Sequence, residues 1–321
     1  MSQIKWTRLG PGVRPRVRNA IEELRAFTAP PPGKTLFVDG DYGSSGGNAE
    51  SWETAVDTIQ AAVDLCGNGD GDIIYVAPHK YQENVLILDH KSISIIAAST
   101  AGWEFQCRAS DASTKYDMTT VGGVAVPGFS FVVLSRGVTI DGFLLDGGGG
   151  YGGIYVGDGY RISTSYDENA ASARIRNCVF RGGGEGNHAM VLDGCSDNVV
   201  IEDCVFDNWT QACIQLDAGG SRTVQNPIIR HCTFKNIASG IYAIDMYSSA
   251  TTVGAVVGPG NVFADKTGVN GYSCRFQSTG VHHFVGNFDG TNGGATGSAT
   301  DYMAGNFEAH AMNSPVYVAE S

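Results

Sequence analysis

Four stretches of the chain share one eight-residue pattern, and this repetition limits the possible folds more than any other feature. They align without gaps at Ile140–Gly147, Ile175–Gly182, Ile201–Asn208 and Ile229–Asn236, and a weaker copy follows at Val257–Phe263. Each of the four begins with isoleucine, has Cys or Phe at the fourth position and has Phe or Leu at the sixth. Their starts are 35, 26 and 28 residues apart. Units this short, without a helical period, predict the coils of a parallel β-helix.

Each copy indicates two short strands joined by a sharp corner. Apolar residues alternate on both sides of the third position, which suits a strand with one buried face. That third position holds Asn177, Asp203 or His231, residue types that tolerate the left-handed backbone conformation. A third strand follows in each coil, at 154–156, 190–192, 214–216 and 242–244. Stacking of the coils predicts two interior columns, in each of which successive residues are about 4.8 Å apart. One column consists of Cys178, Cys204 and Cys232, and the other of Phe180, Phe206 and Phe234.

The segment before the repeats predicts a cap for one end of this solenoid. A strand at 36–38 leads into a Gly-rich turn, and an apolar stripe from Ala55 to Cys66 predicts a helix with Ser51 as its N-cap and Gly67 at its end. Strands are expected again at 72–76 and 84–88. An open solenoid end exposes unpaired backbone, so a covering helix is physically needed. We expect the β-helix with its cap to span 34–274, and 275–321 to be a C-terminal capping or oligomerisation segment.

The first 33 residues differ from the rest in charge. The chain has net charge −12, with net +4 on residues 1–33 and −16 on the remainder. This arm has a helical apolar spacing followed by a Pro-rich linker, and it either folds back on the body or anchors the chain to a partner through Arg14, Arg16, Arg18, Ile21 and Leu24. The acidic body argues against nucleic acid as a partner, and no apolar run is long enough for membrane insertion. The arm has no apolar segment of the signal-peptide type.

Four segments near the N-terminal end carry a resemblance to a known protein family. Val38-Asp-Gly-Asp41, Thr58-Ile-Gln-Ala-Ala62, Gly71-Asp-Ile-Ile-Tyr-Val-Ala-Pro78 and Tyr81-Gln-Glu-Asn84 resemble the opening of right-handed parallel β-helix proteins. These include the pectate-lyase-like superfamily and the tailspikes of bacterial viruses. The resemblance covers roughly residues 35–265 and implies an all-β, right-handed, single-stranded parallel β-helix with an N-terminal capping helix and a short arm. It also implies carbohydrate as ligand or substrate, and a homotrimer as in viral members.

Together these features predict a virion protein of a bacterial virus, of tailspike, fibre or decoration type. The expected location is the virion, with assembly in the host cytoplasm because no signal peptide is seen. Residues 1–33 would attach it to other virion proteins, and its solenoid would bind host surface glycans. Two alternatives stay open: a polysaccharide-degrading glycoside hydrolase or lyase, and a purely architectural capsid decoration protein.

Three aspartates are the candidates for catalysis. Asp193, Asp217 and Asp245 each follow the third strand of consecutive coils, so we expect them to stack in one column that points outward or lies at the corner. Carboxylates about 5 Å apart suit the retaining geometry of glycoside hydrolysis, and alternate coils lie near the range for inverting enzymes. The same residues could instead cap corner amides or bind calcium. The Asn-Thr-Asp and Gly-His-Gly motifs of polygalacturonases are missing from the sequence, which disfavours that activity.

Candidate sugar-binding residues lie near the same column. Tyr155 and Tyr247 are expected to be exposed aromatic residues, and a Gly-rich insertion could place Glu185 or His188 over a groove or could be a plain corner. The eight cysteines form no C-x-x-C pair, so we expect buried thiols and no metal site. No cofactor is expected.

Overall fold

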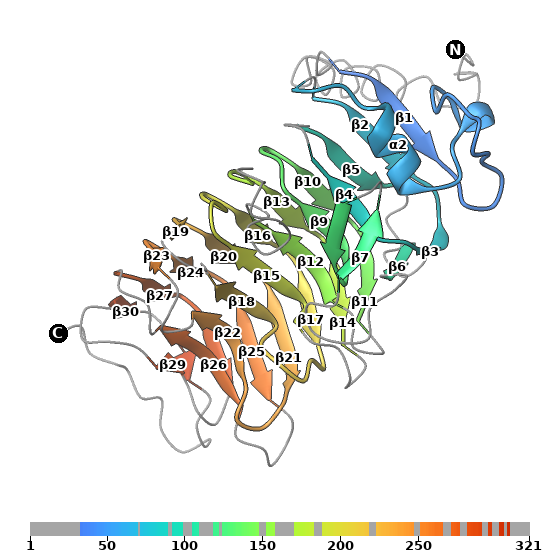
Figure 1. Ribbon diagram of the computed structural model, residues 1–321. Helices are drawn as coiled ribbons and strands as arrows, with labels where there is room; N and C mark the ends of the chain where they lie inside the picture. The colour runs from blue at the N-terminus through green and yellow to red at the C-terminus, as the bar shows by residue number, and fades with distance from the viewer. Residues whose placement is uncertain are drawn as a thin grey trace, which may run out of the picture.

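The computed structural model describes one elongated solenoid whose strands lie side by side from the N-terminal to the C-terminal end (Figure 1). It describes residues 33–308 with these exceptions: 70, 89–91, 99–104, 109–117, 122–123, 148–151, 158–169, 183–187, 218–222, 247–250, 266–270, 277–280, 291–294, 297–301 and 305–306. The predicted anchoring residues Arg14, Arg16, Arg18, Ile21 and Leu24 lie outside the described residues. None of the described helices is long and apolar enough to cross a membrane.

Three parallel sheets, here called A, B and C, form the walls, and from β2 to β29 each coil contributes one strand to each sheet in that order. Sheet A contains β1 (Thr35–Val38), β2 (Ile73–Val76), β5 (Ser94–Ala97), β10 (Thr139–Asp141), β13 (Arg174–Arg176), β16 (Val200–Glu202), β20 (Ile228–Arg230), β24 (Val256–Val257), β27 (His283–Val285) and β30 (Tyr302–Ala304). Sheet B contains β3 (His79–Gln82), β6 (Phe105–Arg108), β11 (Leu144–Asp146), β14 (Val179–Arg181), β17 (Val205–Asp207), β21 (Thr233–Ile237), β25 (Val262–Asp265), β28 (Phe288–Gly290) and β31 (Phe307–Glu308). Sheet C contains β4 (Val85–Ile87), β9 (Phe129–Val133), β12 (Gly152–Val156), β15 (Met190–Asp193), β18 (Ile214–Asp217), β22 (Tyr242–Met246), β26 (Tyr272–Phe276) and β29 (Ala295–Thr296).

Two small strand pairs stand beside these walls. β19 (Thr223–Gln225) pairs in parallel with β23 (Thr251–Val253), and β7 (Met118–Val121) pairs antiparallel with β8 (Val124–Pro127). The three walls themselves extend beyond the Ile/Cys/Phe repeats, because strands after Arg275 continue all three sheets up to β31. The fading of the repeat pattern therefore does not coincide with the end of the coils.

The N-terminal cap is present but shorter than expected. A 3-10 turn (η2, Trp52–Thr54) precedes helix α2 (Ile59–Leu65), which lies beside β1 and β2 at the end of the solenoid (Figure 1). Thr58, and not Ser51, is the N-cap of α2, because Val56 still pairs with Val38 of β1 and holds the preceding backbone extended. The Glu83 carboxylate also accepts hydrogen bonds from the first two amides of the helix, at 2.9 and 3.0 Å, which fixes the cap to the chain between β3 and β4.

The predicted aromatic column is confirmed. Phe180, Phe206, Phe234 and Phe263 occupy one register position in adjacent coils of sheet B. Their ring centroids are 4.6, 4.8 and 4.7 Å apart in turn, and all four side chains are fully buried. The ring spacing matches the strand spacing of a sheet, so the coil geometry itself sets the stacking.

The corners between sheets A and B confirm the predicted left-handed residues and explain the cysteine column. Asn177, Asp203 and His231 have φ values of 53°, 56° and 53°. The Cys204 thiol that follows the corner lies 3.2 Å from the carbonyl oxygen two residues before it, and Cys178 and Cys232 repeat this contact. Each buried thiol therefore donates a weak hydrogen bond to a carbonyl that also accepts a backbone amide of the preceding coil.

A row of alternating charges crosses the outer face of sheet A. Asp141, Arg176, Glu202 and Arg230 are register partners in four successive coils. Arg176 Nε lies 2.9 Å from Asp141 Oδ2, and Arg230 Nη2 lies 2.6 Å from Glu202 Oε2. The hydrogen bond from Arg230 is the main reason that the pKa of Glu202 is lowered, against an opposing effect of burial. This row ties coil to coil on the solvent side.

Candidate functional site

The register of sheet C corrects the predicted carboxylate column. Asp193 and Asp217 are register partners in adjacent coils, as expected. In the next coil, however, Ile244 pairs with Ile214 and Met246 pairs with Leu216, so Asp245 stands beside Gln215. The sequence prediction had aligned Ile244 with Leu216, a shift of two residues. Because the inward positions of β22 are Ile244 and Met246, Asp245 belongs to a different outward row from the other two aspartates.

Asp193 is buried and held by its own corner. Its carboxylate accepts hydrogen bonds from the Tyr155 hydroxyl at 2.7 Å and from the Gly194 amide at 2.8 Å, and its side chain is nearly inaccessible, at 2% exposure. The prediction had placed it outward or at the corner, and the structure places it at the corner and covered. These contacts correspond to the capping alternative, in which an aspartate satisfies donors at a strand end.

Asp245 and Asp217 have more open surroundings. Asp245 forms a two-point ion pair with Arg275, its register partner in the following coil, at 2.6 and 2.5 Å. The two side chains are 15% and 20% exposed. Asp217 accepts a hydrogen bond from Gln215 Nε2 at 3.2 Å within its own strand. An arginine that binds one carboxylate with two parallel hydrogen bonds is fixed in orientation.

Two stacked tyrosines stand next to this ion pair. Tyr242 and Tyr272 begin β22 and β26, are register partners, and have ring centroids 4.6 Å apart with planes inclined by 23°. The guanidinium carbon of Arg275 lies 4.8 Å from the centre of the Tyr242 ring. Both rings are only partly buried. We call the surface made by Gln215, Asp217, Tyr242, Asp245, Tyr272 and Arg275 the tyrosine face.

The predicted sugar-binding residues do not lie on the tyrosine face. Tyr155 is fully buried, contrary to the prediction, because it packs in a second apolar cluster on the outer side of sheet C, with Leu86, Phe129, Val132, Leu134 and Val191. His188 is also buried, with Nδ1 3.0 Å from the Ala212 carbonyl oxygen. Glu185 and Tyr247 lie outside the described residues.

The sequence did carry a signal for the residues that were missed. The segment Tyr242-Ala-Ile-Asp-Met246 matches the earlier third strands only if Ile244 and Met246 are taken as the buried pair. That alignment would have placed Asp245 and Arg275 in one row and Tyr242 and Tyr272 in another.

Among the described residues, no group of three or more His, Cys, Asp or Glu side chains is arranged to hold a metal ion.

The tyrosine face can do two things chemically. Its tyrosine rings offer apolar surface with polar edges, which suits ligands that have both apolar and hydroxyl-bearing faces. The carboxylates of Asp217 and Asp245 can accept hydrogen bonds from hydroxyl groups. Gln215 is buried and donates to Asp217, so it positions that carboxylate. Stacking and acceptance occur on three successive coils, so the face suits an extended ligand that lies along the solenoid axis.

Comparison with known proteins identifies the fold. A family model described as "Right handed beta helix region" matches residues 131–257. No curated protein matches the chain. Among solved structures, the YbhC protein of Escherichia coli is 10% identical with a TM-score of 0.58, over 88% of this chain and 86% of that one.

Two carbohydrate-related enzymes are also similar in structure. The PL6 family alginate lyase AlyGC is 14% identical with a TM-score of 0.53, over 87% of this chain and 40% of that one. The pectin methylesterase of Aspergillus niger is 14% identical with a TM-score of 0.49, over 90% of this chain and 93% of that one. With the three parallel sheets described above, the match over residues 131–257 shows that the chain has the fold of a right-handed parallel β-helix.

Proposed function

We propose that the protein binds a surface polysaccharide along the tyrosine face of sheet C. The single observation that carries this proposal is the stacked pair of Tyr242 and Tyr272 beside the Arg275–Asp245 ion pair. Elsewhere on the described outer face of this sheet, the row Leu86, Val132, Tyr155 and Val191 is apolar and buried. Partly exposed aromatic rings combined with polar groups therefore gather on the C-terminal coils.

An extended glycan fits this face better than a compact ligand. Successive coils repeat about every 4.8 Å, so equivalent side chains form rows parallel to the axis. Tyr242 contributes a ring, and Asp217 contributes a carboxylate in the preceding coil, held by the buried Gln215. Arg275 fixes the adjoining carboxylate of Asp245. A chain of sugar rings can meet an aromatic surface and hydrogen-bonding groups alternately along such rows.

Binding is favoured over hydrolysis by the state of the carboxylates. Asp193 is engaged by Tyr155 and Gly194, and Asp245 is engaged at both oxygens by Arg275. Hydrolysis needs one carboxyl group that delivers a proton and a second that acts as a base or nucleophile. Asp217, the third predicted catalytic residue, accepts a hydrogen bond from Gln215, so the three candidate carboxylates are all engaged by neighbouring groups.

The proposed setting is a virus particle to which residues 1–33 attach the solenoid. This part of the proposal is supported by the contrast between the basic arm, net +4, and the acidic body, net −16. The Pro-rich linker at 30–33 would separate the arm from the body. A homotrimer, as the resemblance to viral tailspikes implies, belongs to the same proposal.

A glycan array tests the binding function. We expect wild-type protein to retain a subset of polysaccharides, and Tyr242→Ala to lose about five- to tenfold in affinity because loss of an aromatic stacking contact costs about 1–1.5 kcal/mol. Tyr75→Ala is the matched control, since Tyr75 is a partly buried tyrosine of sheet A that stacks on Phe37 at the other end of the molecule. Equal binding by the two variants, both with wild-type melting temperatures, would contradict the proposal.

The particle setting needs a separate experiment. Deletion of residues 1–33 is expected to leave a folded body that still binds glycan but no longer enters particles. Incorporation is measured by immunoblotting of purified particles against the full-length protein. Unchanged incorporation of the shortened chain would refute attachment through the arm and would leave the binding proposal standing.

A further inference from the structure

A short apolar row lies on the outer face of sheet A at the N-terminal end of the solenoid. Phe37, Tyr75 and Ile96 are register partners in β1, β2 and β5, and the Trp52 ring lies 4.7 Å from the Phe37 ring, centre to centre. Trp52 is 42% exposed, and the other three side chains are partly buried. We call these four residues the cap row. The next position of the row, in β10, is Asp141, which begins the row of alternating charges.

The cap row is not part of the interior of the solenoid. The inward positions of the same three strands are filled by Leu36, Ile74 and Ile95, which are fully buried. In the later coils of sheet A, this outward row carries charged side chains that pair from coil to coil. Three partly exposed aromatic rings at one end of such a face are therefore typical of an interaction surface.

The surroundings of the cap row are acidic. Residues 34–76, which contain the cap helix, have net charge −7. Glu53 follows Trp52 in turn η2, Glu50 precedes Trp52 by two residues, and both carboxylates belong to exposed side chains. A segment that binds here needs an apolar side for the rings and basic groups for the carboxylates.

The chain contains such a segment directly before the cap. Residues 1–33 have net charge +4. Five apolar residues recur there at the spacing of one helical face, at Val17, Ala20, Ile21, Leu24 and Phe27. On a helix with 3.6 residues per turn, the arginines Arg14, Arg18 and Arg25 share one flank of this stripe. A helix over 17–27 has only about three turns, so it needs a surface to pack on in water.

The lengths of the two surfaces match. The apolar stripe from Val17 to Phe27 is about 15 Å long in a helix. The cap row from Trp52 to Ile96 also measures roughly 15 Å, from the ring spacings and one further strand step.

The connection is long enough for the arm to reach the cap row. Residues 28–33, which include the Pro-rich linker, span about 19 Å in the polyproline conformation. Phe37 lies four residues after Gly33, which is about 13 Å along extended backbone. A helix that ends at Phe27 can therefore lie on the cap row of its own chain.

From these observations we propose that the arm docks on the cap row of its own chain. The apolar stripe packs on the rings of the cap row, and the arginines on its flank lie beside Glu50 and Glu53. One stripe cannot pack on two surfaces at once, so binding of another virion protein would displace the arm from the cap row. The docking itself does not depend on the proposed function, and only this displacement does.

Hydrogen–deuterium exchange of the full chain, followed by mass spectrometry, tests this docking. Amides of residues 17–27 should exchange at least about tenfold more slowly than in an isolated peptide of residues 1–33, because the peptide has no surface to pack on. Trp52→Ala should lower this protection about five- to tenfold. A rise from about 0.1 M to about 1 M salt should also lower it, because the Debye length falls from about 10 Å to about 3 Å.

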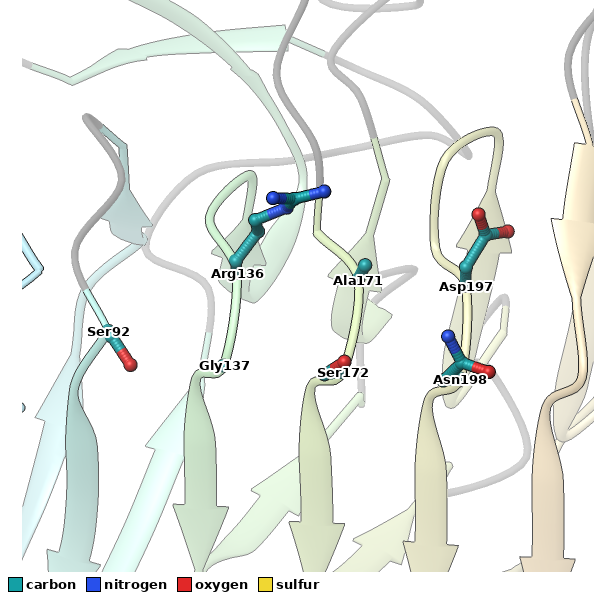
Figure 2. Close-up of a pocket in the computed structure, with 7 residues that line it drawn as sticks. All are labelled: Ser92, Arg136, Gly137, Ala171, Ser172, Asp197 and Asn198. Carbon is teal, nitrogen blue, oxygen red and sulfur yellow. The ribbon is translucent and has the colours of Figure 1, made fainter.

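Two variants that each remove one negative charge give a matched comparison. Glu53→Gln should lower the protection about two- to threefold, as expected for an exposed ion pair. Asp197→Asn should leave it unchanged, because Asp197 lines a polar pocket at the corner before β16, five strands from β1 in sheet A (Figure 2). Asp197 Oδ1 accepts from the Gln225 amide at 2.8 Å, a hydrogen bond that asparagine can keep.

Three results would overturn the inference. Exchange of residues 17–27 at the peptide rate in the wild type would show that the arm is not docked. Equal protection in the wild type and in Trp52→Ala, with equal melting temperatures, would place the arm elsewhere. Protection that increases with protein concentration would show that the arm binds a second copy. Tyr242→Ala should leave the protection unchanged and Trp52→Ala should leave glycan binding unchanged, so this proposal and the tyrosine face fail independently.

Discussion

Replacement of Phe206 by alanine should remove more stability than almost any other single change in the repeats. The ring is fully buried and stacks on both sides, at 4.6 Å from Phe180 and 4.8 Å from Phe234. A buried Phe→Ala change costs about 3–5 kcal/mol, and the value rises with the cavity that remains. Backbone hydrogen bonds fix the spacing of the coils, so neighbouring rings cannot close the gap. We therefore expect a loss of about 4–5 kcal/mol, at the upper end of that range.

Equilibrium urea unfolding followed by circular dichroism measures this loss. Phe288→Ala is the matched control, because Phe288 also lies on a strand of sheet B but is 47% exposed. Its replacement should cost less than about 1 kcal/mol, as for other exposed positions. If both variants lose the same free energy of unfolding, the reasoning that the interior Phe column holds the coils together is refuted.

Two further predictions concern acid stability and thiol reactivity. The hydrogen bond from Arg230 lowers the pKa of Glu202 below its ordinary 4.5. The ionised Glu202 therefore stabilises the folded protein above pH 4.5, and this stabilisation is lost as the pH falls through the lowered pKa. On acidification, the free energy of unfolding of wild type should therefore decline by about 1 kcal/mol more than that of Glu202→Gln. Urea titrations at several pH values measure both declines, and equal declines would contradict this prediction. Burial raises the pKa of the Cys204 thiol, whereas Cys195 is partly exposed. Iodoacetamide at pH 8 should therefore label Cys195 before Cys204, and Cys204 only as the protein unfolds. Equal labelling rates of the two cysteines in mass spectrometry would contradict this prediction.

Much of the fold could be predicted because the interior of a solenoid repeats itself in sequence. Ile140, Ile175, Ile201 and Ile229 are all in register, and the corner residues Asn177, Asp203 and His231 have the expected left-handed backbone. Interior columns are made by side chains that pack on copies of themselves. A residue type that succeeds in one coil is therefore repeated in the next, and this repetition is visible in a single chain.

The cap and the later coils were harder to predict because other contacts determine them. Val56 fits the apolar stripe of a helix, yet it pairs with Val38 as extended backbone, and α2 begins only at Ile59. Beyond Arg275 the coils continue without the Ile/Cys/Phe pattern. Already in the coil before Arg275, Asn261 takes the interior place that Cys232 holds one coil earlier. Its Oδ1 accepts from the Cys232 backbone amide at 2.9 Å, and its Nδ2 donates to the Ile229 carbonyl at 2.9 Å, where the preceding coils use a thiol.

The outer face of sheet C could not be predicted from periodicity alone. Tyr155 and Gln215 occupy the same outward row, yet Tyr155 is fully buried in an apolar cluster. Alternation in a strand shows which side chains point outward, but not which of them other segments cover. In addition, Tyr242-Ala-Ile taken alone supports two registers that differ by two residues. The pairings of β22 with β18 and with β26 show which one is correct.

The most direct test of the central claim is to incubate the protein with host envelope polysaccharide and to measure retained glycan and new reducing ends in the same sample. We predict that wild type retains the polysaccharide without producing reducing ends, and that Tyr242→Ala loses the retention. Asp217→Asn should behave as wild type or bind slightly less. Reducing ends that accumulate with wild type and disappear with Asp217→Asn would contradict the account, because they would show that the face cleaves the glycan it holds.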